Sequence, residues 1–173
     1  SAVAGLISAI EEAAKGDHSV FLIGNGGSAA VASHFVSDMS VHGAAVGRRG
    51  MRVQALTDNI SCITAIGNDY CFEDIFARQL EAQMRPGDLV IALSVSGNSP
   101  NILRAIEYAN AHGGHTYSCA GFDGGQLKTL SQRCIHIESL RKEYGIVEDV
   151  FGAILHMVSR YIALKRAEQE SST

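Results

Sequence analysis

Two side chains suited to moving protons share one face of a predicted helix. His34 and Asp38 are four residues apart in a segment with helical periodicity, and this spacing brings them together on its surface. Imidazole titrates near neutral pH and a carboxylate accepts protons, so the pair is suited to general acid–base catalysis. A surface ion pair without a chemical role is the alternative interpretation of the same spacing.

The last predicted helix carries a second such pair. Glu148 and His156 lie about 12 Å apart along it, so both can serve one centre only if their side chains lean inward or if neighbouring subunits each supply one. A glycine inside a helix costs roughly 1 kcal/mol relative to alanine, so Gly152, between them, indicates a close approach by another group or packing against another helix. The candidate ligands for Zn²⁺ or a similar divalent ion are His34, Asp38, Glu148 and His156.

The stretch Gly24-Asn-Gly-Gly-Ser28 predicts a phosphate-binding turn between a strand and a helix. Free N–H groups and the positive end of the helix dipole meet at such a turn, and glycines allow a ligand to approach closely. Ser28, as the expected N-cap, adds a hydroxyl. A second loop at the end of a strand, Ser94-Val-Ser-Gly-Asn-Ser-Pro100, offers three more hydroxyls from Ser94, Ser96 and Ser99.

Other interpretations of the glycine loop fit less well. A nucleotide-hydrolysing P-loop requires Lys and Ser or Thr after its glycines, where Ala29 and Ala30 stand here. A dinucleotide fold requires an acidic residue at the tip of the second strand, and Asp58 lies too far along the chain. A plain tight turn remains the alternative, but the second serine loop favours a phosphosugar site without a nucleotide cofactor.

Apolar runs alternate with segments of helical periodicity along the chain, which predicts an α/β fold. Strands that are apolar throughout indicate a parallel sheet of five strands covered on both faces, and right-handed crossovers then place both serine and glycine loops at one edge. The strands are expected at residues 20–23, 51–56, 89–93, 115–120 and 134–137, and the helices at 2–15, 28–41, 59–66, 72–84, 101–112, 126–131 and 146–167. The loop over residues 43–50 carries Arg48 and Arg49, which are expected to be solvated.

The composition is that of a folded protein with few basic residues. Of 173 residues 46% are hydrophobic, and the net charge is −4, which disfavours a nucleic-acid partner. No apolar run approaches the roughly 18 residues that span a membrane, and no signal pattern opens the chain, so we expect a cytoplasmic protein without a membrane partner. Four scattered cysteines are expected to be buried reduced thiols: Cys62, Cys71, Cys119 and Cys134.

Taken together, several of these stretches resemble the sugar isomerase (SIS) family and, within it, its phosphoheptose isomerase branch. The resemblance covers about residues 18–165. It rests on Gly24-Asn-Gly-Gly-Ser28, His34-Phe-Val-Ser-Asp38, Asn68-Asp69, the loop from Ser94 to Ser99, Gly121-Phe-Asp-Gly-Gly125, and Val147-Glu-Asp149 with His156.

The resemblance implies a three-layer, flavodoxin-like fold in which residues 1–173 form a single SIS domain, with a helical segment over residues 1–16 and a polar tail over 168–173. It implies a homotetramer that converts sedoheptulose 7-phosphate into an aldoheptose 7-phosphate, D-glycero-D-manno-heptose 7-phosphate, for lipopolysaccharide or capsule. A non-catalytic phosphosugar sensor or a replication-initiator-associating protein of the same fold is the alternative, but neither needs an acid–base set.

The resemblance also implies roles for individual residues. Asp38 would be the base, His156 a general acid or base, and His34 a metal ligand or orienting group, since some members bind zinc. The commoner family form has Glu at the position of Asp38 and Gln at that of Glu148. The residues expected to contact the substrate are Asn25, Gly26, Gly27, Ser28, Asp69, Ser94, Ser96, Ser99 and Glu148.

Overall fold

A computed structural model describes residues 1–42 and 50–171 of the chain, so Arg48 and Arg49 lie outside the described residues. Five parallel strands form one sheet in the order β2-β1-β3-β4-β5, which is the flavodoxin-like order. They are β1 (Ser19–Gly24), β2 (Arg52–Ala55), β3 (Leu89–Ser94), β4 (His115–Ala120) and β5 (Arg133–His136). The expected parallel α/β sheet is confirmed.

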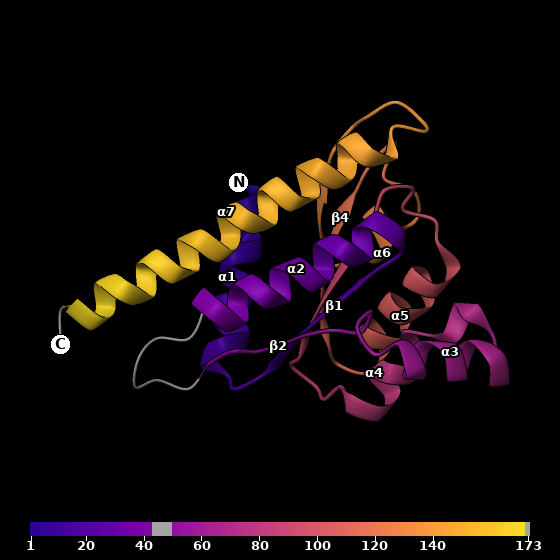
Figure 1. Ribbon diagram of the computed structural model, residues 1–173, viewed down its shortest axis with the longest axis horizontal. Coiled ribbons are helices and arrows are strands. Elements are labelled where there is room, and N and C mark those ends of the chain that lie inside the picture. The colour runs from indigo at the N-terminus through magenta and orange to yellow at the C-terminus, as the bar shows by residue number, and fades with distance from the viewer. Residues whose placement is uncertain (43–49, 172–173) are drawn as a thin grey trace.

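Three helices cover one face of the sheet (Figure 1): α1 (Ala2–Lys15), α2 (Gly26–His42) and α7 (Tyr144–Ser171). Alternate strand residues such as Leu22 and Ile91 point to this face and pack with Phe35 of α2 and Phe151 of α7. This alternation follows from the pleat of a strand, which sends successive side chains to opposite faces. On this face α2 and α7 lie side by side and contact each other along their length.

The other face is covered by α3 (Ile60–Asp69), η1 (Phe72–Asp74), α4 (Ala77–Gln83), α5 (Pro100–Ala111) and α6 (Leu127–Leu130). Phe21 and Val90, the neighbours of the residues that face α2, point here and pack with Phe76, Leu80 and Ile106. Both faces of the sheet are thus buried, which explains the unbroken apolar runs Val20–Ile23 in β1 and Leu89–Leu93 in β3.

Several element boundaries differ from the expected ones. α2 begins at Gly26, so the prediction that Ser28 is its N-cap is wrong. α3 continues to Asp69, three residues beyond its expected end at residue 66. The helix expected at residues 72–84 is divided into η1 and α4, because Ile75 and Phe76 both enter the core between them.

The final helix is longer than expected at both ends. It begins at Tyr144 and continues to Ser171, so residues 168–171 of the expected polar tail are helical. All four cysteines are free. Only Cys119 is fully buried, and its burial raises the pKa of the thiol to about 12. Among the described residues, no helix is both long enough and apolar enough to span a membrane.

Candidate active site

The two serine and glycine loops lie side by side at the carboxyl edge of the sheet. β1 and β3 are neighbours, and Gly24 at the end of β1 pairs with Leu93 near the end of β3. The chain leaves these strands in opposite directions, to α2 on one face and to α5 on the other. Parallel sheets bind ligands at such a point, where the strand order reverses.

Between the two loops lies a small pocket, which we call the serine pocket. Its volume is about 90 Å³, enough for a phosphoryl group. Ser99 is the N-cap of α5 but makes no side-chain capping hydrogen bond, so its hydroxyl can serve a ligand. The residues that line the pocket are Asn25, Ser28, Leu93, Ser94, Val95, Ser96, Ser99, Tyr144 and Glu148.

Glu148 lies inside the serine pocket and contacts the start of α2. One carboxylate oxygen, Oε1, accepts hydrogen bonds from the Ser28 N–H at 2.9 Å and from the Ser28 hydroxyl at 3.2 Å. The other oxygen lies over Gly27, where an added Cβ would be 2.1 Å from it. The N-terminus of α2 is thus capped by a carboxylate from α7, which complements the positive end of the helix dipole.

Asn25 is held by a residue that the sequence analysis did not single out. Its side-chain amide and that of the buried Asn101 exchange two hydrogen bonds, of 2.9 and 2.8 Å. Next to it, Gly26 has a φ of +53°, which favours glycine at this point of the turn. The pair joins the loop after β1 to the start of α5 and thereby fixes the width of the pocket.

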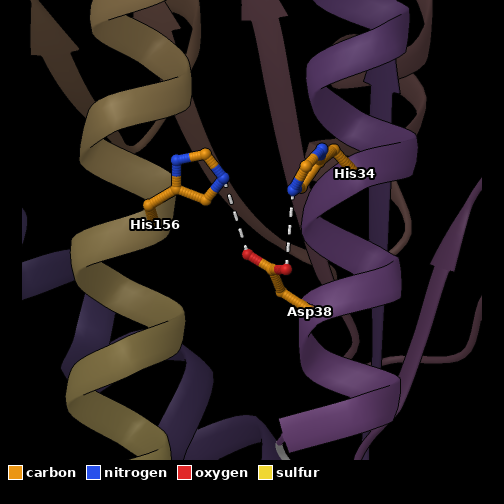
Figure 2. Close-up of side chains that lie close together, drawn as sticks. All are labelled: His34, Asp38 and His156. Atoms are coloured by element: carbon orange, nitrogen blue, oxygen red, sulfur yellow. Dashed lines mark ion pairs between the residues drawn. The ribbon is translucent and has the colours of Figure 1, made fainter.

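A second group of polar side chains lies further along α2, as Figure 2 shows. Asp38 lies between two imidazoles: His34 Nε2 is 3.6 Å from one carboxylate oxygen and His156 Nε2 is 3.7 Å from the other. The two rings meet edge to face with their centroids 4.8 Å apart. The hydroxyl of Ser159, one turn beyond His156, lies 3.2 Å from Asp38 Oδ2, to which it can donate a hydrogen bond.

These three side chains could hold a metal ion. One ligand atom from each of His34, Asp38 and His156 lies within 4.8 Å of the others. Two imidazole nitrogens and a carboxylate oxygen are a donor set found in catalytic zinc sites, which leave a further position for water or substrate. Glu148, the fourth expected ligand, is not in this group and instead contacts Ser28.

A cavity of about 200 Å³ lies between α2 and α7 beside this group. Gly152 lines it, and an added Cβ there would have no atom of the other described residues within 4 Å, apart from the backbone of its own helix. Neither close approach nor packing of another described helix therefore explains this glycine. His34 follows Ser28 by six positions, which corresponds to about 9 Å along the helix. The residues lining the cavity are Ala30, Val31, His34, Phe35, Gly152, Leu155 and His156.

The structure brings together most, but not all, of the expected site residues. Asn25, Ser28, Ser94, Ser96, Ser99 and Glu148 line the serine pocket, with Gly26 and Gly27 in its glycine turn, and His34, Asp38 and His156 form the second group. Asp69 lies apart from both, exposed at the end of α3, where it accepts a hydrogen bond from Asn68. The sequence analysis missed Asn101, Tyr144 and Ser159. Of these, only Ser159 carried a local signal, since it lies one turn beyond His156.

The chain is similar to proteins with known names. A family model described as the SIS domain matches residues 1–121. A probable phosphoheptose isomerase of Thermoplasma acidophilum is 37% identical over 160 residues, which cover 92% of this chain and 86% of that protein. The phosphoheptose isomerase of Citrifermentans bemidjiense is 43% identical over 131 residues, which cover 76% of this chain and 68% of that protein.

Two solved structures agree over nearly the full length of this chain. The phosphoheptose isomerase of Neisseria gonorrhoeae has a TM-score of 0.85 at 28% identity and covers 93% of this chain and 84% of its own. The phosphoheptose isomerase of Francisella tularensis has a TM-score of 0.85 at 29% identity, and the match covers 94% of this chain and 85% of that chain. From the matched family model, the identities and the shared fold, it follows that the chain belongs to the SIS domain family, in its phosphoheptose isomerase branch.

Proposed function

We propose that this protein is an aldose–ketose isomerase that converts sedoheptulose 7-phosphate into D-glycero-D-manno-heptose 7-phosphate through an enediol intermediate. The observation that carries the proposal is the spacing of two sites along α2. The serine pocket lies at its start, and the acid–base group of His34, Asp38 and His156 begins about 9 Å further along. This separation suits a sugar that is held by a terminal phosphate and reacts near its other end.

The phosphate-binding role falls to the serine pocket. The hydroxyls of Ser94, Ser96 and Ser99 donate hydrogen bonds to phosphate oxygens, and the N-terminus of α5 supplies positive potential without a lysine. Gly26, Gly27 and Ser28 provide backbone N–H groups on the opposite wall. Asn25 and Asp69 are assigned to sugar hydroxyls by the family resemblance, and Asp69 then acts on a neighbouring subunit's substrate.

The proton transfers fall to Asp38 and His156. Asp38 removes the proton from C1 of the ketose while His156 protonates the carbonyl oxygen on C2, which gives the enediol. Return of a proton to C2 and loss of the hydroxyl proton from the oxygen on C1 then give the aldose. His34 and Ser159 hold the Asp38 carboxylate in position, since both contact it from fixed helices.

The donor set fits a bound divalent ion, and we propose Zn²⁺. His34, Asp38 and His156 would hold it through one atom each, and the two imidazoles with one carboxylate match the ligands that zinc accepts. The second ring nitrogen of His156 and the second carboxylate oxygen of Asp38 would then be the atoms that exchange protons. When bound, the ion would polarise the substrate's oxygen atoms. Glu148 would join these ligands only after leaving Ser28.

We further propose that the protein acts as a homotetramer in the cytoplasm and supplies heptose for lipopolysaccharide or capsule. The side chains of His34 and His156 are 61% and 57% exposed in the single chain, whereas enediol chemistry benefits from exclusion of water. A neighbouring subunit would provide that cover. A cytoplasmic location suits the substrate, because a phosphosugar dianion does not cross a membrane unaided.

The test is to incubate the protein with sedoheptulose 7-phosphate and to follow the products by NMR. Asp38→Asn and His156→Ala should each lower kcat by about 100-fold or more, since general acid–base catalysis contributes roughly 10²–10⁴-fold. Binding of the phosphosugar, measured by calorimetry, should persist in both variants. Unchanged turnover in either variant would remove that residue from the mechanism, and no product with the unmodified, metal-replete protein would refute the proposed function.

A further inference from the structure

The serine pocket already contains a negatively charged group of the chain itself, the carboxylate of Glu148. Among the described residues, Glu148 is the only charged one that lines the pocket, and no lysine or arginine of residues 1–42 or 50–171 does so. Its carboxylate accepts the hydrogen bonds of the Ser28 N–H and hydroxyl, which are two of the donors that a phosphoryl group would use on this wall. The second carboxylate oxygen covers Gly27.

A phosphoryl dianion and this carboxylate cannot share the pocket at low cost. The volume is only about 90 Å³, so the two groups would lie within a few ångströms of each other. Like charges at that distance repel strongly where water is scarce, and none of the described residues that line the pocket is a cation that would offset the repulsion. Any anion that uses the Ser28 donors must therefore displace Glu148.

We propose that Glu148 is a specificity-determining residue, which competes with the phosphoryl group for the N-terminus of α2 and thereby selects phosphosugars over free inorganic phosphate. Both ligands must displace the carboxylate. Only a phosphosugar carries hydroxyls along the line from the serine pocket toward His34, and these can donate hydrogen bonds to the displaced carboxylate. The inference rests on the proposed function for the identity of the ligand, but not for the contact itself.

The sharpest variant is Glu148→Gln, which removes the charge and keeps the shape of a half-buried side chain. Dissociation constants for inorganic phosphate and for sedoheptulose 7-phosphate are measured by calorimetry on the full chain, both zinc-loaded and after chelation. Glu148→Gln should tighten the binding of inorganic phosphate about tenfold and change that of the phosphosugar much less, so that selectivity falls. Asp149→Asn is the matched control, since it removes a carboxylate from an exposed neighbouring position of α7 outside the pocket. Glu148→Ala, with folding checked by circular dichroism, should tighten phosphate binding in the same direction.

Three results would overturn the inference. The first is an affinity for inorganic phosphate that is the same in the unmodified protein and in both Glu148 variants. The second is an equal increase in the affinities for inorganic phosphate and for the phosphosugar. The third is a change in selectivity that occurs only in the zinc-loaded protein, which would assign Glu148 to the metal. Turnover of sedoheptulose 7-phosphate is measured in parallel. Normal turnover without the selectivity change refutes this inference alone, whereas the selectivity change without turnover refutes the isomerase.

Discussion

The Asp38 carboxylate, which we propose as the base, is surrounded by three polar side chains from two helices. Two imidazole nitrogens lie 3.6 and 3.7 Å from its oxygens, which is near enough for electrostatic interaction. The hydroxyl of Ser159 limits rotation of the same carboxylate. Because His34 comes from α2 and His156 from α7, the geometry depends on how these two helices pack and not on either helix alone.

The serine hydroxyls of the serine pocket are expected to contribute to substrate binding and not to the chemical step. Ser96→Ala should raise KM roughly 10- to 100-fold, because a hydrogen bond to a charged group contributes about 1.5–3 kcal/mol. kcat should change little, since Ser96 lies in the serine pocket, which we propose to hold the phosphate, and not beside Asp38. Steady-state kinetics measure both constants. Ser131→Ala is the control, because this buried hydroxyl has no hydrogen-bond partner in the described part of the chain and lies outside the serine pocket. A fall in kcat with constant KM would place Ser96 with the reacting groups instead.

The sequence predicted part of this site for clear physical reasons. The four-residue spacing of His34 and Asp38 fixed their common face, and the strand-to-helix turns located the serine loops. Ser159 and Asn101 could not be found in the same way, because their partners are distant in sequence and depend on tertiary register. The contact between Glu148 and Ser28 could not be predicted either, because these residues are 120 positions apart in the sequence.

At the scale of elements, the pairing of α2 with α7 positions both sites. The helices run in the same direction: Ser28 contacts Glu148 near their starts, and Asp38 contacts Ser159 further along. The apolar strands were readily predicted, since burial on both faces leaves an unbroken apolar run. The starts of the helices were predicted less accurately. Gly26 and Tyr144 are the first residues of α2 and α7, and each follows a turn whose conformation is set by neighbouring loops.

Gly152 provides a prediction in which stability and activity change in opposite directions. Gly152→Ala should stabilise α7 by roughly 1 kcal/mol, because an added Cβ has no neighbour within 4 Å. This corresponds to an increase in Tm of about 2–4 °C, measured by calorimetry. Turnover should fall severalfold, since the methyl group enters the cavity between Ala30 and His156.

The matched control for that variant is Gly145→Ala. Gly145 also lies in α7 and also has open space around its Cβ position, but it does not line the cavity. This change should leave turnover close to that of the unmodified protein. If Gly152→Ala were equally harmless to turnover, substrate would not use the space beside Gly152.

One face of α7, the longest helix in the described part of the chain, carries exposed apolar side chains. α7 has 28 residues and extends beyond the sheet toward its C-terminus, as Figure 1 shows. Its inner stripe packs in the core through Phe151 and Val158, whereas a second apolar stripe is exposed: Ile146, Val150, Met157, Tyr161 and Leu164. Large apolar side chains at helical spacing on an exposed face mark an interaction surface, and a second copy of the chain is the partner that the proposed homotetramer supplies.

Charges placed on this stripe should therefore dissociate the assembly and reduce catalysis together. Met157→Glu combined with Leu164→Glu places two carboxylates where we expect an apolar contact, and burial of unpaired charge is costly. Light scattering after size-exclusion chromatography should show a smaller species, and turnover should fall because His34 and His156 lose their cover from water. Glu107→Lys, at an exposed position of α5 on the opposite face of the sheet, should change neither mass nor turnover. A double variant that keeps its mass would exclude this stripe as the subunit contact, and one that dissociates with full turnover would show that a single chain completes the site.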